Sequence, residues 1–142
     1  MGKFSDQVDE FARTYKKRLR AAGRAAVQDT IKMAQKTRGD GGRMPVVTGF
    51  LRASIQGALV RMPDGPTTNV GNATHPLGSQ VAGEPVVVTL VKWDPNLSVP
   101  LFIGWTAVYA RHREAQDGFL QGAVEKWDQT IRRAANKVRI GL

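Results

Sequence analysis

The stretch of sequence that decides the fold is Thr48-Gly49-Phe50-Leu51-Arg52-Ala53-Ser54-Ile55. Thr48 is a good helix N-cap, and the apolar residues after Gly49 can pack on a core. From Ile55 onward apolar positions alternate loosely, as in a strand. A second stretch is Ile103-Gly104-Trp105-Thr106-Ala107-Val108-Tyr109-Ala110-Arg111-His112-Arg113-Glu114, and it indicates a strand that ends in a polar turn. The two stretches predict helix and strand in one fold.

The composition bounds the class of protein. A chain of 142 residues can form one domain, because folding at this size buries roughly 68–70% of the surface that the unfolded chain exposes. Without cysteine the chain forms neither a disulfide nor a thiolate metal site, which fits a reducing compartment. No apolar run approaches the roughly 18 residues of a membrane span, and the first residues turn polar where a secretory signal would be apolar. We expect a cytosolic single-domain protein, residues 1–142, without membrane contact.

Two amphipathic helices are predicted at the ends of the chain. In residues 1–36, apolar side chains mostly recur every three or four positions and would share one helix face, with Ser5 as the N-cap. Gly23 costs about 1 kcal/mol relative to alanine inside a helix, so we expect either a bend there or the close approach of another backbone. The second helix is predicted over residues 118–140, and Trp127 on its apolar stripe is expected in the core.

Two glycine-rich segments are predicted to lack regular structure. Residues 37–47 contain Gly39, Gly41 and Gly42, and we expect a flexible hinge that adds nothing to the core. Residues 64–83 are rich in Gly, Asn, Thr and Ser and are predicted to form one long loop. Loops of this length are uncommon in compact domains and are usually functional, so we expect this one to become ordered on a partner.

Three strands are predicted between the helices, at residues 54–62, 85–93 and 99–106. Residues 85–93 are rich in β-branched side chains and precede the turn residues Asp94-Pro95-Asn96, so the last two strands would form a hairpin. The predicted fold class is α+β, with a small antiparallel β-sheet within residues 48–114. We expect this sheet to pack against the long N-terminal helix and the C-terminal amphipathic helix.

The available side chains argue against an enzyme. Catalysis by a Ser-His-Asp set needs a histidine base, and the chain has only His75, before a proline, and His112, between two arginines. Two separated histidines match no metal-ligand spacing. The glycine-rich 39–43 segment lacks the Lys-Ser/Thr ending of a phosphate-binding loop. We expect no catalytic residue, cofactor or metal site.

The net charge of +9 is unevenly distributed. Residues 1–43 hold eleven Lys and Arg against five Asp and Glu, residues 44–101 three against three, and residues 102–142 seven against four. On the first helix Lys17, Arg20 and Arg24 share a face, and each could neutralise a phosphate. The alternative is a solvated face opposite the apolar one.

These charges leave a second function open, a small nucleic-acid-binding protein that uses the basic helix face. No base-stacking aromatic residues are interleaved with the charges and no helix-turn-helix pattern is present, so such binding would lack sequence specificity.

Glu114, at the end of the second quoted stretch, could pair with a nearby cation, Arg52 or Arg111. Such an ion pair could be structural or could lie between subunits.

The two quoted stretches resemble segments of the tail-completion or head-tail joining proteins in the neck of long-tailed bacteriophages. Members of that family commonly carry a Thr-Gly-x-Leu-Arg-x-Ser-Ile segment, a later Tyr-Ala-x-x-x-Glu segment and a closing helix. In this chain the segments are residues 48–55 and 109–114, and Phe119-Leu120 opens the closing helix. The similarity follows the same order over most of the chain.

The resemblance implies a structural protein of the virion, assembled in the cytoplasm of the bacterial host. Such proteins form a ring, usually of six copies, between the head connector or stopper and the tail terminator or tail tube. The implied partners are further copies of the chain, neighbouring neck and tail proteins, and the phage DNA that passes through the lumen. The candidate residues for fold and interface support are Phe50, Leu51, Arg52, Trp105, Tyr109 and Glu114.

Overall fold

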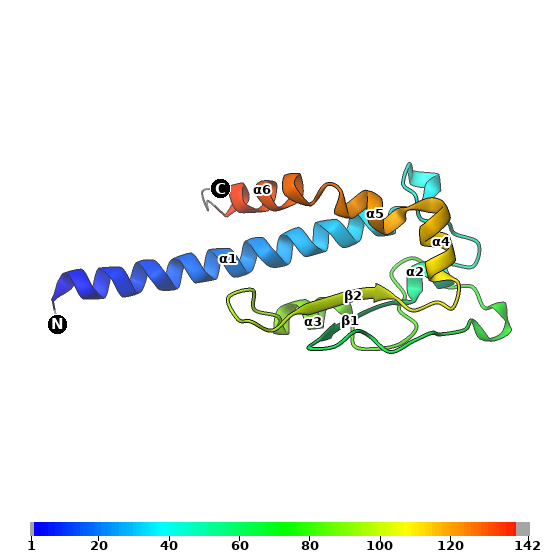
Figure 1. Ribbon diagram of the computed structural model, residues 1–142, viewed down its shortest axis with the longest axis horizontal. Coiled ribbons are helices and arrows are strands. Elements are labelled where there is room, and N and C mark those ends of the chain that lie inside the picture. The colour runs from blue at the N-terminus through cyan, green and yellow to red at the C-terminus, as the bar shows by residue number, and fades with distance from the viewer. Residues whose placement is uncertain (1, 139–142) are drawn as a thin grey trace.

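Helix α1 (Lys3–Gln35) is the longest element of the computed structural model, which describes residues 2–138. Figure 1 shows α1 between two layers. Helices α5 (Phe119–Val124) and α6 (Trp127–Lys137) lie along one side, and the antiparallel strands β1 (Ile55–Leu59) and β2 (Leu101–Trp105) lie along the other. The predicted α+β class, a small antiparallel sheet with long flanking helices, is confirmed.

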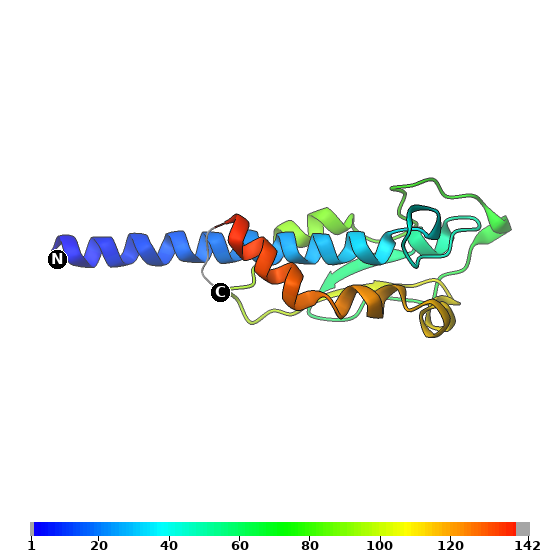
Figure 2. The same ribbon diagram turned by 90° about the horizontal axis from the view of Figure 1, so that it is seen from above.

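The C-terminal half of α1 packs on α6 through alanines. Ala22 and Ala26 of α1 are buried against Ala134 and Ala135 of α6, and these small side chains let the two helices approach closely. The N-terminal half of α1 extends beyond the end of α6 in both views (Figures 1 and 2). The predicted amphipathic helix is therefore present, but α6 covers only part of its apolar face.

Two details of α1 differ from the prediction. Gly2 precedes the helix, so the N-cap predicted at Ser5 is wrong. The helix runs unbroken through Gly23, where an added Cβ would lie 3.1 Å from Cγ of Pro95. Gly23 marks a close approach, as predicted, but the approaching group is a proline side chain rather than a backbone.

A second core cluster joins the end of α1 to the sheet. Phe50 and Met44 are its largest fully buried side chains. The amide oxygen of Gln35 accepts a hydrogen bond from the Trp105 indole N–H at 2.9 Å, and its amide nitrogen donates to the Arg52 carbonyl at 3.1 Å. One side chain thus ties α1 to β2 and to the short helix α2 (Phe50–Ala53).

The segment predicted as a hinge is a hydrogen-bonded turn that contains the 3-10 helix η1 (Arg38–Asp40). The Arg38 amide donates to the Met44 carbonyl and the Met44 amide donates to the Lys36 carbonyl, each at 3.1 Å. Because Met44 is fully buried, the prediction that residues 37–47 add nothing to the core is wrong. Hinge motion stays a prediction.

Residues 85–93, predicted as a strand, form helix α3 (Val86–Lys92). Thr89 and Leu90 are buried where α3 contacts β1, whereas Val87 and Val91 are exposed. Packing of this helical face on the sheet outweighs the preference of valine for strands, which is weak and context-dependent. The predicted hairpin and three-stranded sheet are therefore wrong, because the sheet in the described residues has two strands.

The C-terminal part of the chain is more divided than predicted. The single helix predicted there is two helices, α5 and α6, with a break between them. Trp127, at the start of α6, is 38% exposed, so the core position predicted for this residue is wrong. Both helices make their main contacts with α1 rather than with the sheet. The polar turn predicted after β2 is helix α4 (Ala110–Asp117). Residue 140, the predicted helix end, lies outside the described residues.

Two arginines of α1 hold the end of α3. Arg20 donates to the Asp94 carboxylate at 2.9 Å. Arg24 donates to the carbonyl oxygens of Trp93 and Val91, at the C-terminal end of α3, where the helix dipole favours a cation. Hydrogen bonds from Arg20, the largest cause, and from Asn96 lower the pKa of Asp94 from 3.8 to about 2. The turn after α3 is thereby anchored to the middle of α1.

We predict that acid weakens the contact between Arg20 and Asp94. Asp94→Asn should remove the part of the pH dependence of stability that this contact causes. The pKa of Asp94 is lower in the folded than in the unfolded protein, so the contact stabilises the fold above pH 3.8 and is lost as the pH falls toward 2. Denaturant unfolding from about pH 6 downward measures the effect. The difference in unfolding free energy between wild type and variant should shrink toward pH 2. A difference that stays constant over this range would contradict the assignment.

Candidate functional site

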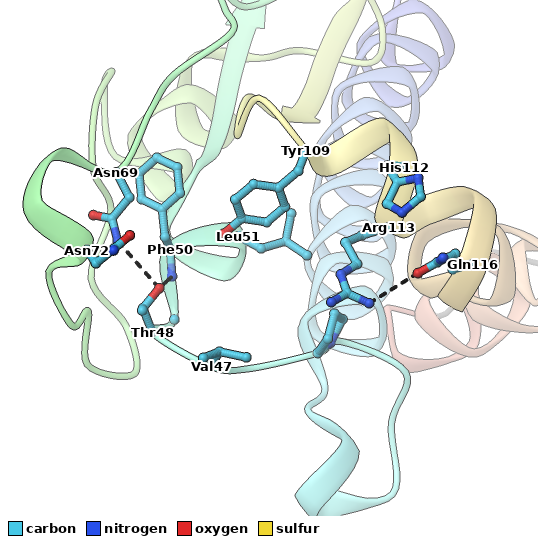
Figure 3. Close-up of a pocket in the computed structure, with 12 residues that line it drawn as sticks. Val47, Thr48, Phe50, Leu51, Asn69, Asn72, Tyr109, His112, Arg113 and Gln116 are labelled. Atoms are coloured by element: carbon cyan, nitrogen blue, oxygen red, sulfur yellow. Dashed lines mark hydrogen bonds between the residues drawn. The ribbon is translucent and has the colours of Figure 1, made fainter.

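A pocket of about 610 Å³ opens between α2, α4 and the long loop (Figure 3). Phe50 and Leu51 come from α2, Tyr109 directly precedes α4, and Asn69 and Asn72 come from the loop around the 3-10 helix η2 (Val70–Asn72). The full lining is Pro45, Val47, Thr48, Gly49, Phe50, Leu51, Asn69, Asn72, Tyr109, His112, Arg113 and Gln116. Half of these residues are polar or charged, namely Thr48, Asn69, Asn72, His112, Arg113 and Gln116.

The backbone at Gly49 sets the position of the pocket walls. Gly49 has φ +82°, and an added Cβ would lie 2.2 Å from the carbonyl oxygen of His75. The His75 amide donates to the Thr48 carbonyl at 2.6 Å, and the Phe50 amide donates to the Thr48 hydroxyl at 3.3 Å. The N-cap of α2 is Gly49, so the N-cap predicted at Thr48 is wrong by one residue, although the Thr48 hydroxyl still accepts this hydrogen bond from the first residue of the helix. The loop reaches the pocket because Gly49 has no side chain.

We predict that Gly49→Ala destabilises the protein more than Gly78→Ala does. Both glycines have positive φ, +82° and +87°, but only Gly49 faces a close atom. A left-handed alanine costs about 1–2 kcal/mol, and Gly49→Ala should exceed this because the His75 segment must move. Urea unfolding of the two variants measures the difference. Equal losses would contradict the proposed contact.

The pocket is cationic. Arg113 and His112 line it on the α4 side, and a neighbouring hollow of about 430 Å³ shares Val47 and Arg113 and adds Arg38 and Arg52. No Asp or Glu of the described residues lines either hollow. We call the two hollows together the pocket face. Its charge favours a partner that brings carboxylates or other anions.

Three interactions hold polar side chains of the pocket face in place. Arg113 donates to the Gln116 side chain at 3.2 Å, and its guanidinium lies 3.7 Å from the Asp117 carboxylate behind the lining. Asp117 also pairs with Arg38. Burial raises the pKa of Tyr109, against the opposing effect of the positive charge of Arg113, so this phenol stays neutral at pH 7. The pocket therefore presents fixed cations beside a neutral phenol.

The structure brings some of the predicted site residues together. Phe50, Leu51 and Tyr109 share the pocket, and the Phe50 and Tyr109 rings have centroids 6.3 Å apart. Arg52 lies in the adjacent hollow. Trp105 does not line the pocket. Its ring packs edge-on against that of Phe119, with the ring centroids 5.3 Å apart, and belongs to the core.

Glu114 has a different role from the predicted one. It pairs with neither Arg52 nor Arg111, because its two carboxylate oxygens accept hydrogen bonds from the backbone amides of Leu120 and Gln121, each at 2.9 Å. These amides belong to the first turn of α5, where amides lack partners within the helix and a negative charge is favourable. Glu114 therefore caps α5 and fixes its start relative to α4.

We predict that Glu114→Ala lowers the free energy of unfolding by about 0.5–2 kcal/mol, the usual cost of losing a helix cap. Glu125→Ala is the matched control, because Glu125 is exposed and accepts a hydrogen bond only from the Gln121 side chain among the contacts seen. It should change stability by no more than about 0.5 kcal/mol. Chemical denaturation of both variants measures this. A Glu114→Ala loss no larger than the control would exclude the capping role.

The predicted basic face of α1 is partly occupied. Arg20 and Arg24 use their guanidinium groups on α3 and its following turn, whereas Lys17 is exposed. Two of the three predicted side chains thus already have hydrogen-bond partners within the chain, and phosphate binding by this face stays a prediction. Exposed cations remain nearer the N-terminus, at Arg13, Lys16 and Arg18.

Sequence reasoning missed several residues of the pocket. Asn69 and Asn72 lie in a segment whose only signal was its length, and the Asn69 amide group donates to the Ala73 carbonyl at 2.9 Å and contacts His75 at 2.9 Å. Gln116 was missed because α4 was expected to be a turn. The spacing of His112, Arg113 and Gln116 would have shown one helical face if helix had been assumed.

His112 lines the pocket, but no described carboxylate lines it as well. Within residues 2–138, no three or more His, Cys, Asp or Glu residues are grouped to hold a metal ion. No helix in that range combines the length and apolarity that crossing a membrane requires.

Comparisons of the chain with protein-family models, with curated protein sequences and with solved structures found no match.

Proposed function

We propose that the chain is a structural protein of the neck of a long-tailed bacteriophage, which completes the tail and joins it to the head. It acts without catalysis and assembles as a ring, of six copies by the family resemblance. The observation that carries the proposal is that both family-like segments meet at one pocket. Phe50 and Leu51 of the first segment and Tyr109 of the second share its walls.

The pocket explains why these segments would be kept together in an assembly protein. Gly49 is required for the close approach of the loop backbone, and Glu114 is required for the start of α5. Both residues support the geometry of a surface rather than a reaction. A ring needs such a surface, because one contact repeated by rotation can close without any enzyme site.

The long loop supports the same proposal. Apart from η2 it has no helix or strand, yet backbone hydrogen bonds attach it at several points. The Thr67 amide donates to the Thr106 carbonyl at 2.6 Å, and the Val81 amide donates to the Ala53 carbonyl at 2.8 Å. The loop is thus anchored at both ends and at His75, and the exposed residues between these anchors, among them Val70 and Leu77, are offered to a partner. We propose neighbouring neck or tail proteins as that partner, with phage DNA in the lumen.

Electron microscopy of phage lysates tests the proposal. The gene is stopped early in the phage or prophage that encodes it, and the wild-type gene is supplied from a plasmid as the control. We expect DNA-filled heads beside unattached tails, and normal virions when the plasmid is present. Overlong tails would indicate termination rather than joining. Normal virions without the plasmid would overturn the proposal.

In that case, titration of DNA against the purified protein decides whether nucleic-acid binding replaces the neck role. A steep fall in DNA affinity with rising salt would favour that function, because each neutralised phosphate releases counterions.

A further inference from the structure

The smaller hollow of the pocket face is built around three arginines. Arg38, Arg52 and Arg113 all line this hollow, whose volume is about 430 Å³. They come from three separate segments, the turn that contains η1, helix α2 and helix α4. Like charges repel each other, and more strongly where less water surrounds them. The three guanidinium groups therefore need negative charge close by.

Two carboxylates of the chain contact residues of this hollow and supply part of the negative charge. Asp117, whose side chain is 7% exposed, pairs with Arg38 and lies 3.7 Å from the Arg113 guanidinium. Asp40 accepts a hydrogen bond from the hydroxyl of Thr37, which also lines the hollow, at 3.1 Å. Among residues 2–138, no other carboxylate contacts a side chain that lines the hollow.

Arg52 is the cation of the hollow that lacks a counter-charge. Its backbone carbonyl accepts the hydrogen bond from Gln35, but its guanidinium has no ion-pair partner in the described part of the chain. Three arginines against two carboxylates leave one positive charge in excess. Because a guanidinium group can form two parallel hydrogen bonds with one carboxylate, a single acidic side chain from another molecule balances the hollow.

Exposed apolar side chains lie beside this unpaired cation. Val47 is 91% exposed and lines both hollows, and Val46, also exposed, lines the smaller one. Tyr109 lines the larger hollow, and Figure 3 shows its ring beside the Leu51 side chain. Arginine and aromatic side chains are enriched where proteins bind one another. A partner that covers this surface therefore brings apolar groups as well as an anion.

These features fit a peptide segment better than a nucleic acid. A nucleic-acid backbone carries a phosphate at every step and is bound by rows of cations, whereas this hollow has one unpaired cation beside two valines. An extended peptide projects alternate side chains to the same side. Because the two hollows share Pro45, Val47 and Arg113, residues two positions apart in such a peptide can enter both.

We infer that the pocket face binds an extended segment of a neighbouring neck or tail protein, with an acidic side chain on Arg52 and an apolar side chain against Val47 and Tyr109. This inference rests on the neck role proposed above and names the chemistry that the partner brings. The contact gives the Arg52 guanidinium an anion and removes an exposed valine from water.

Four variants test the contact. Arg52→Gln removes the unpaired cation, and Arg132→Gln is the matched control, because Arg132 is exposed on α6 and lines neither hollow. Val47→Glu and Val47→Lys remove the same valine and place opposite charges where the two hollows meet. Circular dichroism of the purified proteins checks that each variant is folded.

Each variant is supplied from the plasmid in the lysate experiment, and virions with joined tails are counted. Arg52→Gln and Val47→Glu should give about tenfold fewer joined virions than wild type, because one removes the cation and the other repels the acidic segment. Arg132→Gln and Val47→Lys should stay within about twofold of wild type. Full restoration by Arg52→Gln would overturn the inference, and so would equal defects of Val47→Glu and Val47→Lys.

A binding titration measures the same contact without the phage. The probes are a fluorescein-labelled peptide of alternating Glu and Val, a matched peptide of alternating Gln and Val, and a short single-stranded DNA. The Glu peptide should bind the wild-type protein about tenfold more tightly than the Gln peptide, and Arg52→Gln should remove this difference. Equal affinity for the two peptides would overturn the inference. Tighter binding of the DNA that also depends on Arg52 would overturn it in favour of a phosphate site.

The two experiments separate failure of this contact from failure of the neck role. Joined virions with the Arg52→Gln plasmid, and none without a plasmid, would overturn the docking inference and leave the neck role in place. Normal virions without any plasmid would overturn the neck role and, with it, the assignment of the partner to a neck or tail protein. The peptide titration would then still decide whether the pocket face binds an acidic segment.

Discussion

The close approach of the His75 backbone to Gly49 is the constraint on which the candidate site depends. The distance of 2.2 Å from a hypothetical Cβ leaves no space for any other residue without movement. Because the loop passes here, its Asn69 and Asn72 side chains reach the pocket, and Phe50 gains a ring contact with His75 at 5.5 Å. The Thr-Gly pair is thus explained by packing of two backbones rather than by chemistry.

The role of each arginine depends on which elements pack beside it. In the C-terminal half of α1, Arg20 and Arg24 donate hydrogen bonds to Asp94 and to the Trp93 carbonyl at the end of α3, and so stabilise the fold. At the end of the molecule beyond α1, Arg38 and Arg113 share Asp117 and remain at the pocket face. The net charge alone therefore does not show that Arg20 and Arg24 hold α3, or that Arg38 and Arg113 share one carboxylate at the pocket face.

The sequence predicted an element correctly where its local pattern fits only one kind of secondary structure. Periodicity identified α1 and the region of α5 and α6, since long amphipathic patterns are hard to confuse with strands. Residues 85–93 were misread, because a short valine-rich run fits a strand or a half-buried helix, and contact with β1 decided between them. Glu114 was assigned to an ion pair, because no local rule places the amides of Leu120 and Gln121 against it.

The sequence by itself determined the elements whose causes are local. These are the amphipathic helices and the absence of any disulfide. Tertiary structure alone decided which surfaces are buried and which remain exposed. Burial of Thr89 against β1, the cap on α5 and the meeting of α2 with Tyr109 all join residues distant in the chain. Packing energies of this kind depend on the three-dimensional neighbours, and no pattern within one segment contains them.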